Sequence, residues 1–477
     1  MILFNLKNSR EGQVESHSLK IQQDKTSAKN ALYQIKRRSL SISDYCQPFI
    51  QKSINDDLNV WAHIDESEIQ QQVEYLSANL QSKFEENLAD SRASHQKKSD
   101  SERIDPSAKL PGLPVAIKDI IDIAGIETGC GSKIYQGLEA PLHHKKAIDA
   151  SVVSRLRAAG GILMGKTVTT EFATFQAADT KNPAALGRTP GGSSSGSAAA
   201  VAAGMVPLAL GTQTAGSIIR PASYCGVVGF KPTIGTLDLS GVKALARSFD
   251  TLGVFAGCVE DAALLMDSLT GNHWMVQCRE DNQPRKVGLC RSPYWSAASD
   301  DLCKVWEDLV YLLKSMDSVI VDEFHLPPEF GGAVELHKRV LAREAFDALH
   351  FEWKAYRSLI SSKLSIILEE GEATKTECYL ADIQKIRSLR REFDRVLCDF
   401  DVLITPSSPG VPPPIEEGTG DPIFNRLWSL LGVPALNVPG LQGEKGWPIG
   451  IQVVSRQGED AKVIAASFWL ENILKAT

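Results

Sequence analysis

Short apolar runs alternate with longer amphipathic segments along most of the chain, and this alternation is the main structural signal in the sequence. Apolar runs of strand length, bounded by polar or turn-forming residues, indicate buried strands. The predicted strands cover residues 113–117, 162–164, 205–210, 287–289, 318–321, 402–404, 436–438 and 449–454.

The segments between these runs have apolar residues at roughly helical spacing. Gly160-Gly161 marks the end of one such helix, and Glu260 and Asp261 mark the start of another. The predicted helices cover residues 59–80, 152–159, 198–203, 259–269, 300–314, 335–356, 376–398 and 460–474. Alternating strands and helices predict an α/β fold with a buried sheet covered by helices on both faces.

The beginning of the chain has a different composition. Residues 1–43 are rich in Lys, Gln, Ser and Asn and poor in aromatic residues. We expect a polar N-terminal extension, either disordered in part or forming a surface helix around residues 27–38. A solvated extension is favoured over a partner-binding arm. Residues 44–477 contain no linker or internal repeat, so we assign them to one domain.

Charge and cysteine usage narrow the classes of function. The chain has 477 residues, with 51 Lys and Arg against 58 Asp and Glu, a net charge of −7 that argues against a nucleic-acid partner. No apolar run reaches the ~20 residues of a membrane span, and residues 1–6 are too short for a signal peptide. Nine scattered cysteines without a C-x-x-C pair, and no H-E-x-x-H motif, predict a cytoplasmic protein with reduced thiols and without a metal site.

The candidate chemistry lies in two turns rich in Gly and Ser, residues 191–197 and 211–217. The predicted helix 198–203 and strand 205–210 separate them, so one turn opens a helix and the other follows a strand. Glycines there allow close approach of the backbone and leave N–H groups free to face an anion. Either turn alone would be read as an ordinary loop. A third element, Lys118, ends the predicted strand 113–117.

At these residues the chain resembles the amidase signature family, the Ser–cis-Ser–Lys hydrolases. The resemblance rests on Val-Ala-Ile-Lys-Asp at 115–119, Gly-Gly-Ser-Ser-Ser-Gly at 191–196 and Thr-Ala-Gly-Ser-Ile at 214–218. Ser193 and Ser217 are 24 residues apart, as the family's two catalytic serines are. The resemblance extends from about residue 58 to about residue 474, and implies one α/β domain with a mixed sheet.

The resemblance implies a proton relay between three residues. Neutral Lys118 accepts a proton from Ser193, Ser193 accepts one from Ser217, and the Ser217 oxygen attacks an amide carbonyl. Burial at the end of an apolar strand is suited to keeping a lysine neutral. Backbone N–H groups of Thr214, Ala215, Gly216 and Ser217 would form the oxyanion hole, and the peptide bond before Ser193 is expected to be cis.

Each assignment has an alternative. Lys118 could be a surface lysine paired with Asp119, which the two serine turns argue against. Ser194 or Ser195 could replace Ser193 in the relay, although the 24-residue spacing favours Ser193. Ser217 could be a helix N-cap, a role that is compatible with that of a nucleophile.

The sequence departs from the common family pattern at three positions. Gln213 replaces Asp, Ala215 replaces Gly and Ile219 replaces Arg, with Arg220 one position further along. We interpret the loss of Asp and Arg together as replacement of a charged pair, because one buried charge left alone is unfavourable. Ala215 would be strained if the turn required positive φ at that position.

The leading functional hypothesis is an amidase that hydrolyses the C–N bond of a small-molecule amide. The alternative is the glutaminase A subunit of a tRNA-dependent Asp/Glu amidotransferase, which acts with partner subunits. A third hypothesis, a non-catalytic binding protein, is disfavoured by the retention of Lys118, Ser193 and Ser217. The family resemblance suggests a homodimer.

Overall fold

The computed structural model describes residues 27–94 and 109–476, with residues 83–94 described as backbone only. Residues 1–26 of the predicted extension lie outside the described residues. The rest of the extension contains helix α2 (Ala28–Lys36), whose first turn is capped by the Ser27 hydroxyl. Ala28, Ala31, Leu32 and Ile35 on this helix are buried and belong to the main hydrophobic core.

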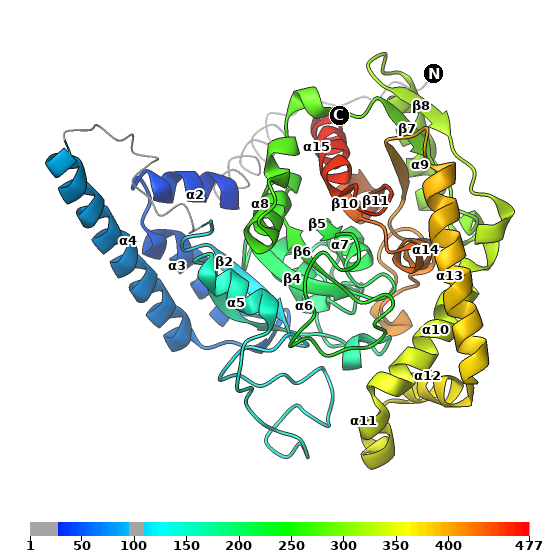
Figure 1. Ribbon diagram of the computed structural model, residues 1–477, viewed down its shortest axis with the longest axis horizontal. Helices are drawn as coiled ribbons and strands as arrows, with labels where there is room; N and C mark the ends of the chain where they lie inside the picture. Colours follow the sequence, from blue (N-terminus) through cyan, green and yellow to red (C-terminus); the bar gives the residue numbers. More distant parts are fainter. Residues whose placement is uncertain (1–26, 95–108, 477) are drawn as a thin grey trace.

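One mixed sheet of 11 strands organises the described chain, in the order β1-β3-β2-β4-β6-β5-β10-β11-β9-β7-β8. Figure 1 shows β2, β4, β5 and β6 in the middle of the molecule. The strands are β1 (Trp61–His63), β2 (Pro114–Lys118), β3 (Ile162–Thr167), β4 (Leu208–Gln213), β5 (Val228–Lys231), β6 (Thr251–Ala256), β7 (Lys286–Leu289), β8 (Ile320–Glu323), β9 (Val402–Pro406), β10 (Ala435–Gln442) and β11 (Pro448–Val454).

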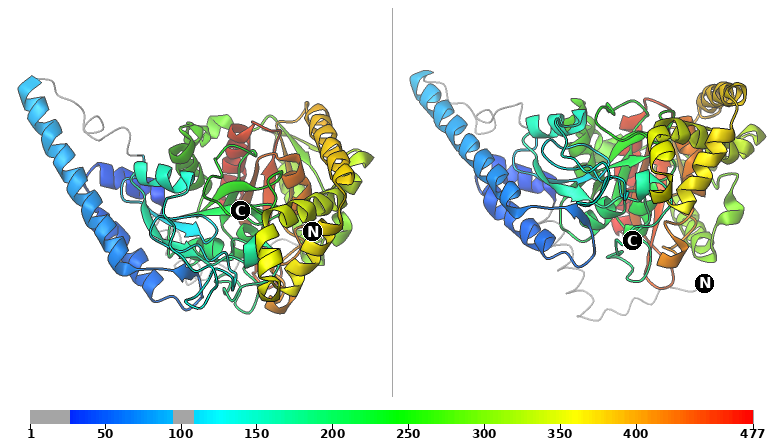
Figure 2. Two further views of the ribbon diagram at one scale, coloured as in Figure 1. Left: turned by 60° about the horizontal axis from the view of Figure 1, so that its bottom comes forward. Right: turned by 90° about the horizontal axis from the view of Figure 1, so that it is seen from below.

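Helices surround this sheet, and a group of them from the C-terminal half lies together at one end of the molecule (Figures 1 and 2). Besides α2, the helices are α3 (Ile42–Ile54), α4 (Glu66–Ser94), α5 (Ser151–Ala158), α6 (Ser195–Ala202), α7 (Ile219–Cys225), α8 (Val259–Thr270), α9 (Asp300–Lys314), α10 (Ala333–Ala348), α11 (His350–Ala355), α12 (Ser362–Ala373), α13 (Thr376–Val396), α14 (Ile423–Leu431) and α15 (Asp460–Ala476). Short 3₁₀ turns complete the connections. No described helix combines the length and apolar character needed to cross a bilayer.

Strand pairing places the predicted strand ending at Lys118 in the interior of the sheet. β2 lies between β3 and β4 and is parallel to both, whereas β4 is antiparallel to β6. Ile117 pairs with Leu210, so Lys118 at the end of β2 lies beside the residues of β4 that lead into the second Gly/Ser turn. The predicted α/β fold with a mixed, helix-covered sheet is confirmed.

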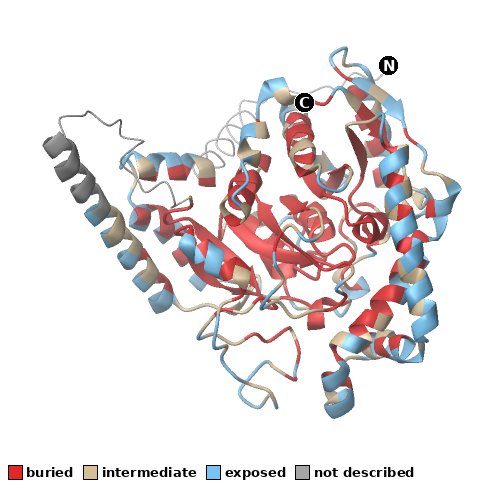
Figure 3. Cartoon of the chain, in the orientation of Figure 1, coloured by how far each residue is buried: buried red, intermediate tan, exposed pale blue. Residues whose placement is uncertain are grey.

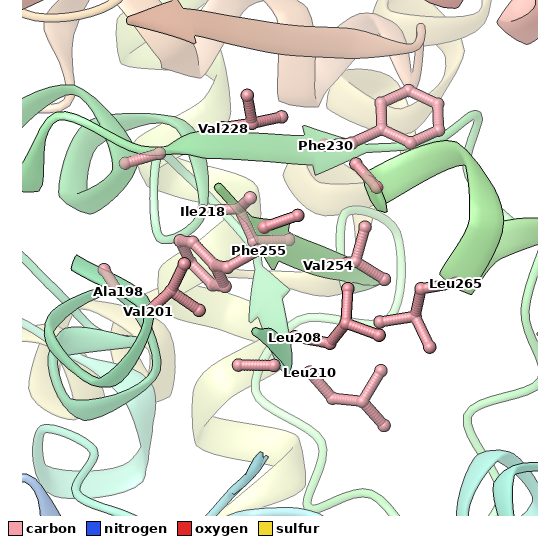
Figure 4. Close-up of a cluster of buried hydrophobic side chains, with 14 of the residues drawn as sticks. Ala198, Val201, Leu208, Leu210, Ile218, Val228, Phe230, Val254, Phe255 and Leu265 are labelled. Carbon is pink, nitrogen blue, oxygen red and sulfur yellow. The ribbon is translucent and has the colours of Figure 1, made fainter. Parts of the chain in front are cut away.

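Burial is greatest along the centre of the sheet (Figure 3). Strands β2, β3, β4, β5 and β6 are buried along their whole length, as expected for a sheet covered on both faces. Figure 4 shows Ala198 and Val201 of α6 on one side of these strands and Leu265 of α8 on the other.

Three predicted elements have different boundaries in the structure. The prediction of one helix over 59–80 was wrong at its start, because Trp61 and His63 pair with β3 as an edge strand before α4 begins at Glu66. The predicted strand 205–210 begins only after Pro207 and continues to Gln213, since these later residues pair with β6. The predicted helix 335–356 is two helices, α10 and α11.

Candidate active site

Lys118 ends β2 inside the protein, and its side chain contacts two hydroxyl groups. Its Nζ lies 2.7 Å from the Ser193 Oγ and 2.8 Å from the Thr212 Oγ1. Thr212 lies on β4, the parallel neighbour of β2, so the register of these two strands places the Thr212 hydroxyl beside the Lys118 side chain. Ser193 comes from the loop before α6.

The surroundings of Lys118 favour a neutral amine. The residue is 0 % exposed, and burial lowers the pKa of its ammonium group to about 7, although the Asp250 carboxylate opposes this shift. The neighbouring carboxylate, Asp119, pairs instead with Lys166 at 2.9 Å. The alternative of a surface lysine paired with Asp119 is therefore excluded.

The Ser193 loop has the backbone geometry that the resemblance implies, since the Gly192–Ser193 peptide bond is cis. Gly191 has a φ of 82°, and a Cβ at this position would lie 2.9 Å from the Pro221 Cα, so glycine is required there. The Arg220 guanidinium donates to the carbonyl of Gly192 at 2.7 Å. The loop is thus tied to α7, which follows the second turn.

The two neighbouring serines make contacts typical of turn residues. The Ser194 hydroxyl donates to the Thr212 carbonyl at 3.2 Å, and the Ser195 hydroxyl donates to the Val168 carbonyl at 3.5 Å. Of the serines in this loop, Ser193 is the one in contact with Lys118.

Residues 214–218 form the connection between β4 and α7, which we call the Ser217 turn. Ser217 is 6 % exposed, and within the described residues no hydrogen bond joins its hydroxyl to Ser193 or Lys118. The structure therefore joins Lys118 to Ser193 directly and places Ser217 on the turn that follows Thr212. A Cβ at Gly216 would lie 2.5 Å from the Asn425 Oδ1, which explains the glycine.

The backbone N–H groups of Thr214, Ala215, Gly216 and Ser217 have no hydrogen-bond acceptor among the described residues. These are the four groups expected to form an oxyanion hole. The Thr214 side chain faces elsewhere, because its hydroxyl donates to the Asp250 carboxylate at 2.6 Å. Burial raises the pKa of Asp250 to about 6.

The departures from the common family pattern have structural explanations. The Gln213 Oε1 accepts the backbone N–H groups of Ile218 and Ile219 at 2.9 and 3.0 Å, so Gln213 caps α7 and Ser217 does not. Ala215 is not among the residues with positive φ, so alanine fits the turn without that strain. Ile219 is fully buried in an apolar cluster that includes Phe249 and Trp428, and the adjacent Arg220 is buried against the Ser193 loop.

Two residues that hold the Ser217 turn were not singled out from the sequence. His337 of α10 stacks on Phe249 and lies with its Nε2 2.9 Å from the Thr214 carbonyl oxygen. Ser429 of α14 donates to the Ala215 carbonyl at 2.8 Å. They lie 123 and 214 residues away from their partners in sequence, so no local pattern could have identified them.

A cavity of about 380 Å³ opens beside these residues. Thr212, Thr214 and Asp250 line it, together with Lys243 and the exposed Arg247. A second cavity of about 300 Å³ lies between α4 and β3 and contains none of the candidate residues. The described residues hold no group of three or more His, Cys, Asp or Glu arranged to bind a metal ion.

The mixed sheet and the contact between Lys118 and Ser193 are typical of an α/β hydrolytic enzyme. Comparison with known proteins identifies the family. The sequence profile of the Amidase family matches residues 67–464. The chain belongs to the amidase family, hydrolases that act on carbon–nitrogen bonds.

Relatives and solved structures are similar to the chain over most of its length. A solved amidase matches 94% of this chain and 99% of its own, with a TM-score of 0.78 and 29% identity. The A subunit of the Glutamyl-tRNA(Gln) amidotransferase of Alkaliphilus metalliredigens (strain QYMF) is 32% identical over 417 residues, which are 76% of this chain and 83% of the relative. The solved A subunit of the Thermotoga maritima enzyme has a TM-score of 0.65 and 30% identity, covering 76% of this chain and 83% of its own.

Proposed function

We propose that the protein is an amidase that hydrolyses the C–N bond of a small-molecule amide through an acyl-enzyme on Ser217. The observation that carries this proposal is the 2.7 Å contact between the buried Lys118 Nζ and the Ser193 Oγ. A lysine with a pKa of about 7 is half deprotonated near neutral pH, so it can serve as a general base there.

In the proposed reaction, the Ser217 proton passes to the Ser193 oxygen while the Ser193 proton passes to neutral Lys118. The Ser217 oxygen forms a bond to the amide carbon, and the resulting oxyanion faces the free N–H groups of the Ser217 turn. The C–N bond then breaks, and Lys118 returns its proton through Ser193 to the leaving nitrogen. A water molecule, deprotonated by the same relay, hydrolyses the acyl-enzyme and releases the acid.

The second candidate is a glutaminase A subunit of a tRNA-dependent amidotransferase. Curated relatives with that name, at 30–33% identity, favour it. The solved amidase favours the first candidate, because it matches 94% of the chain against 76% for the solved amidotransferase subunit. Hydrolysis of amides by the purified chain alone would support the amidase, whereas glutamine hydrolysis that requires added subunits would support the second candidate.

The test uses the purified chain and a fluorophosphonate probe, with the adduct mapped by mass spectrometry. We expect modification at Ser217 and hydrolysis of at least one amide in a substrate screen. An adduct on another serine, with none on Ser217, would overturn the assignment of the nucleophile.

Serine variants test the relay. We expect Ser217→Ala to abolish labelling and turnover, and Ser193→Ala to lower turnover by about 10²- to 10⁴-fold, the range for loss of a proton-transfer group. Ser195→Ala is the matched control, because its hydroxyl makes only a 3.5 Å contact with the Val168 carbonyl. Full activity of folded Ser217→Ala would remove the relay from consideration. A cytoplasmic location and a homodimer stay predictions.

A further inference from the structure

The peptide links of the Ser217 turn have their carbonyl oxygens held by hydrogen bonds on the side opposite to their N–H groups. Gly192–Ser193 is the cis peptide bond of the described chain, so the links after Thr214, Ala215 and Gly216 are trans. In a planar trans peptide the C=O and N–H bonds point in opposite directions. Holding the carbonyl of one residue therefore fixes the direction of the next residue's N–H group.

The carbonyl of Ala215 is held by Ser429, and Gln213 determines where the Ser429 proton points. The Gln213 Oε1 accepts the N–H groups of Ile218 and Ile219, so its amide nitrogen must be the atom 3.0 Å from the Ser429 Oγ. An amide nitrogen only donates, so the Ser429 oxygen accepts, and its own proton goes to the Ala215 carbonyl at 2.8 Å. These contacts fix the Gly216 N–H.

The carbonyl of Thr214 is held in the same way by His337. The Arg426 guanidinium, which only donates, lies 3.1 Å from the His337 Nδ1. The imidazole proton is therefore on Nε2, which donates to the Thr214 carbonyl at 2.9 Å. This contact fixes the Ala215 N–H. The carbonyl of Gly216 accepts the Arg220 N–H within the first turn of α7.

We propose that Ser429, oriented by Gln213, and His337, oriented by Arg426, are positioning residues that hold the Gly216 and Ala215 N–H groups toward the oxyanion of the reaction. This inference rests on the proposed function, because it gives the Ser217 turn a catalytic task. Neither residue lines the cavity beside the site. Both reach the turn from the C-terminal half of the chain, from α14 and α10.

The experiment measures the inactivation of the full chain by the fluorophosphonate probe, whose phosphoryl oxygen occupies the position of the oxyanion. We compare Ser429→Ala with Ser467→Ala, which removes another fully buried hydroxyl on α15 that has no hydrogen-bond partner in the described residues. We expect Ser429→Ala to lower the maximal inactivation rate by about 10- to 100-fold, somewhat less than outright loss of an oxyanion donor. The probe concentration for half-maximal rate is expected to stay within about threefold of the wild-type value, because the N–H groups act mainly on the charge that develops as the Ser217 oxygen attacks phosphorus.

Gln213→Glu provides a second variant of nearly unchanged shape. The carboxylate keeps the acceptor for Ile218 and Ile219 but cannot donate to Ser429, so the Ser429 proton turns away from Ala215. We expect Gln213→Glu to lose as much of the maximal inactivation rate as Ser429→Ala does. Ser429→Thr keeps the hydroxyl and is expected to retain most of the wild-type rate.

Wild-type rates in both folded Ser429→Ala and Gln213→Glu would overturn the positioning role and leave the proposed function intact. An equal loss in Ser467→Ala would also overturn it, since the effect would then be general to buried hydroxyls. A wild-type chain that labels at no serine and hydrolyses no amide would overturn the proposed function and this inference together.

Discussion

At the scale of the residue, two buried lysines have similarly lowered pKa values but different partners. Lys118 and Lys231 are both 0 % exposed, and burial lowers the pKa of each to about 7. Their partners differ. Lys118 contacts two hydroxyls that can exchange protons, whereas the Lys231 Nζ donates to the Pro232 carbonyl, which cannot. Of the two, Lys118 is the one with a proton path to a serine.

This difference predicts opposite results for two matched variants. We expect Lys118→Met to lose fluorophosphonate labelling at Ser217 by at least about a hundredfold, because the proton acceptor is removed. Lys231→Met removes an equally buried lysine and is expected to label at close to the wild-type rate. Labelling rates of the folded variants, followed by mass spectrometry, test this pair. Equal loss in both would mean that Lys118 has a structural role only.

The pH dependence of the reaction follows from the same group. Because the neutral form of Lys118 is the proposed base, activity is expected to rise as pH increases through about 7 and to level off above about 8. Asp250 lines the same cavity with a pKa of about 6, and its ionised form favours protonated Lys118. A profile of kcat/KM against pH tests the prediction, and a rate independent of pH between about 6 and 9 would argue against lysine as the base.

Much of the candidate site could be predicted from sequence because its chemistry is carried by local motifs. The contact of Lys118 with Ser193, and the free N–H groups of the Ser217 turn, join three such motifs. The roles of Gln213 and Ser429 could not be predicted, because a side-chain contact across 216 residues leaves no local pattern. The alternative prediction that Ser217 caps a helix was wrong, because the Gln213 side chain accepts the N–H groups at the start of α7.

At the scale of the element, the ends of β2 and β3 are joined beside the site by a buried ion pair. The Lys166 Nζ lies 2.9 Å from the Asp119 carboxylate, and it also donates to the Glu127 carbonyl and the Thr128 hydroxyl. Both side chains are almost fully buried. Removing one partner leaves the other charge uncompensated in a low dielectric.

We therefore expect Asp119→Ala to lower the free energy of unfolding by about 3–5 kcal/mol. The double variant Asp119→Ala with Lys166→Met removes both charges. Its free energy of unfolding is expected to fall by less than that of Asp119→Ala alone. Urea unfolding of the two variants and the wild type measures the difference. A double variant less stable than Asp119→Ala would show that the charges stabilise the fold beyond satisfying each other.

Helix α9 was predicted from the sequence, whereas α14 and β6 were not. The helix over 300–314 was predicted with the bounds of α9, which has one buried face. In contrast, α14 was not predicted, because it has only nine residues and its polar residues Asn425, Arg426 and Ser429 are buried rather than exposed to solvent. β6 contains Gly253, where a Cβ would lie 2.2 Å from the Phe230 carbonyl oxygen, and glycine weakens a strand signal.

At the scale of the whole molecule, the first described helix is tied to the middle of the chain. The Asp261 carboxylate, at the start of α8, accepts the N–H groups of Ala28 and Lys29 and the Ser27 hydroxyl. The neighbouring Glu260 pairs with the Lys29 side chain near the surface. Two adjacent carboxylates thus contact α2 with different degrees of burial.

Asp261→Ala is expected to lower the free energy of unfolding by about 2 kcal/mol, because two backbone N–H groups lose their acceptor. We also expect faster tryptic cleavage at Lys36 and Arg37, which end α2. Glu260→Ala is the matched control and is expected to lose less than about 1 kcal/mol, as exposed pairs do. Equal proteolysis rates in the two variants would contradict the proposed attachment.

The origin of His337 and Ser429 in the last third of the chain has a consequence for biosynthesis. A nascent chain that ends after α9 contains Lys118, Ser193 and Ser217, yet it lacks both side chains that orient the turn. Contacts between residues this distant in sequence form late in folding. We therefore expect labelling of Ser217 to appear only at the end of refolding, when α10 and α14 have packed against the Ser217 turn, so that an unfinished chain is not yet a hydrolase.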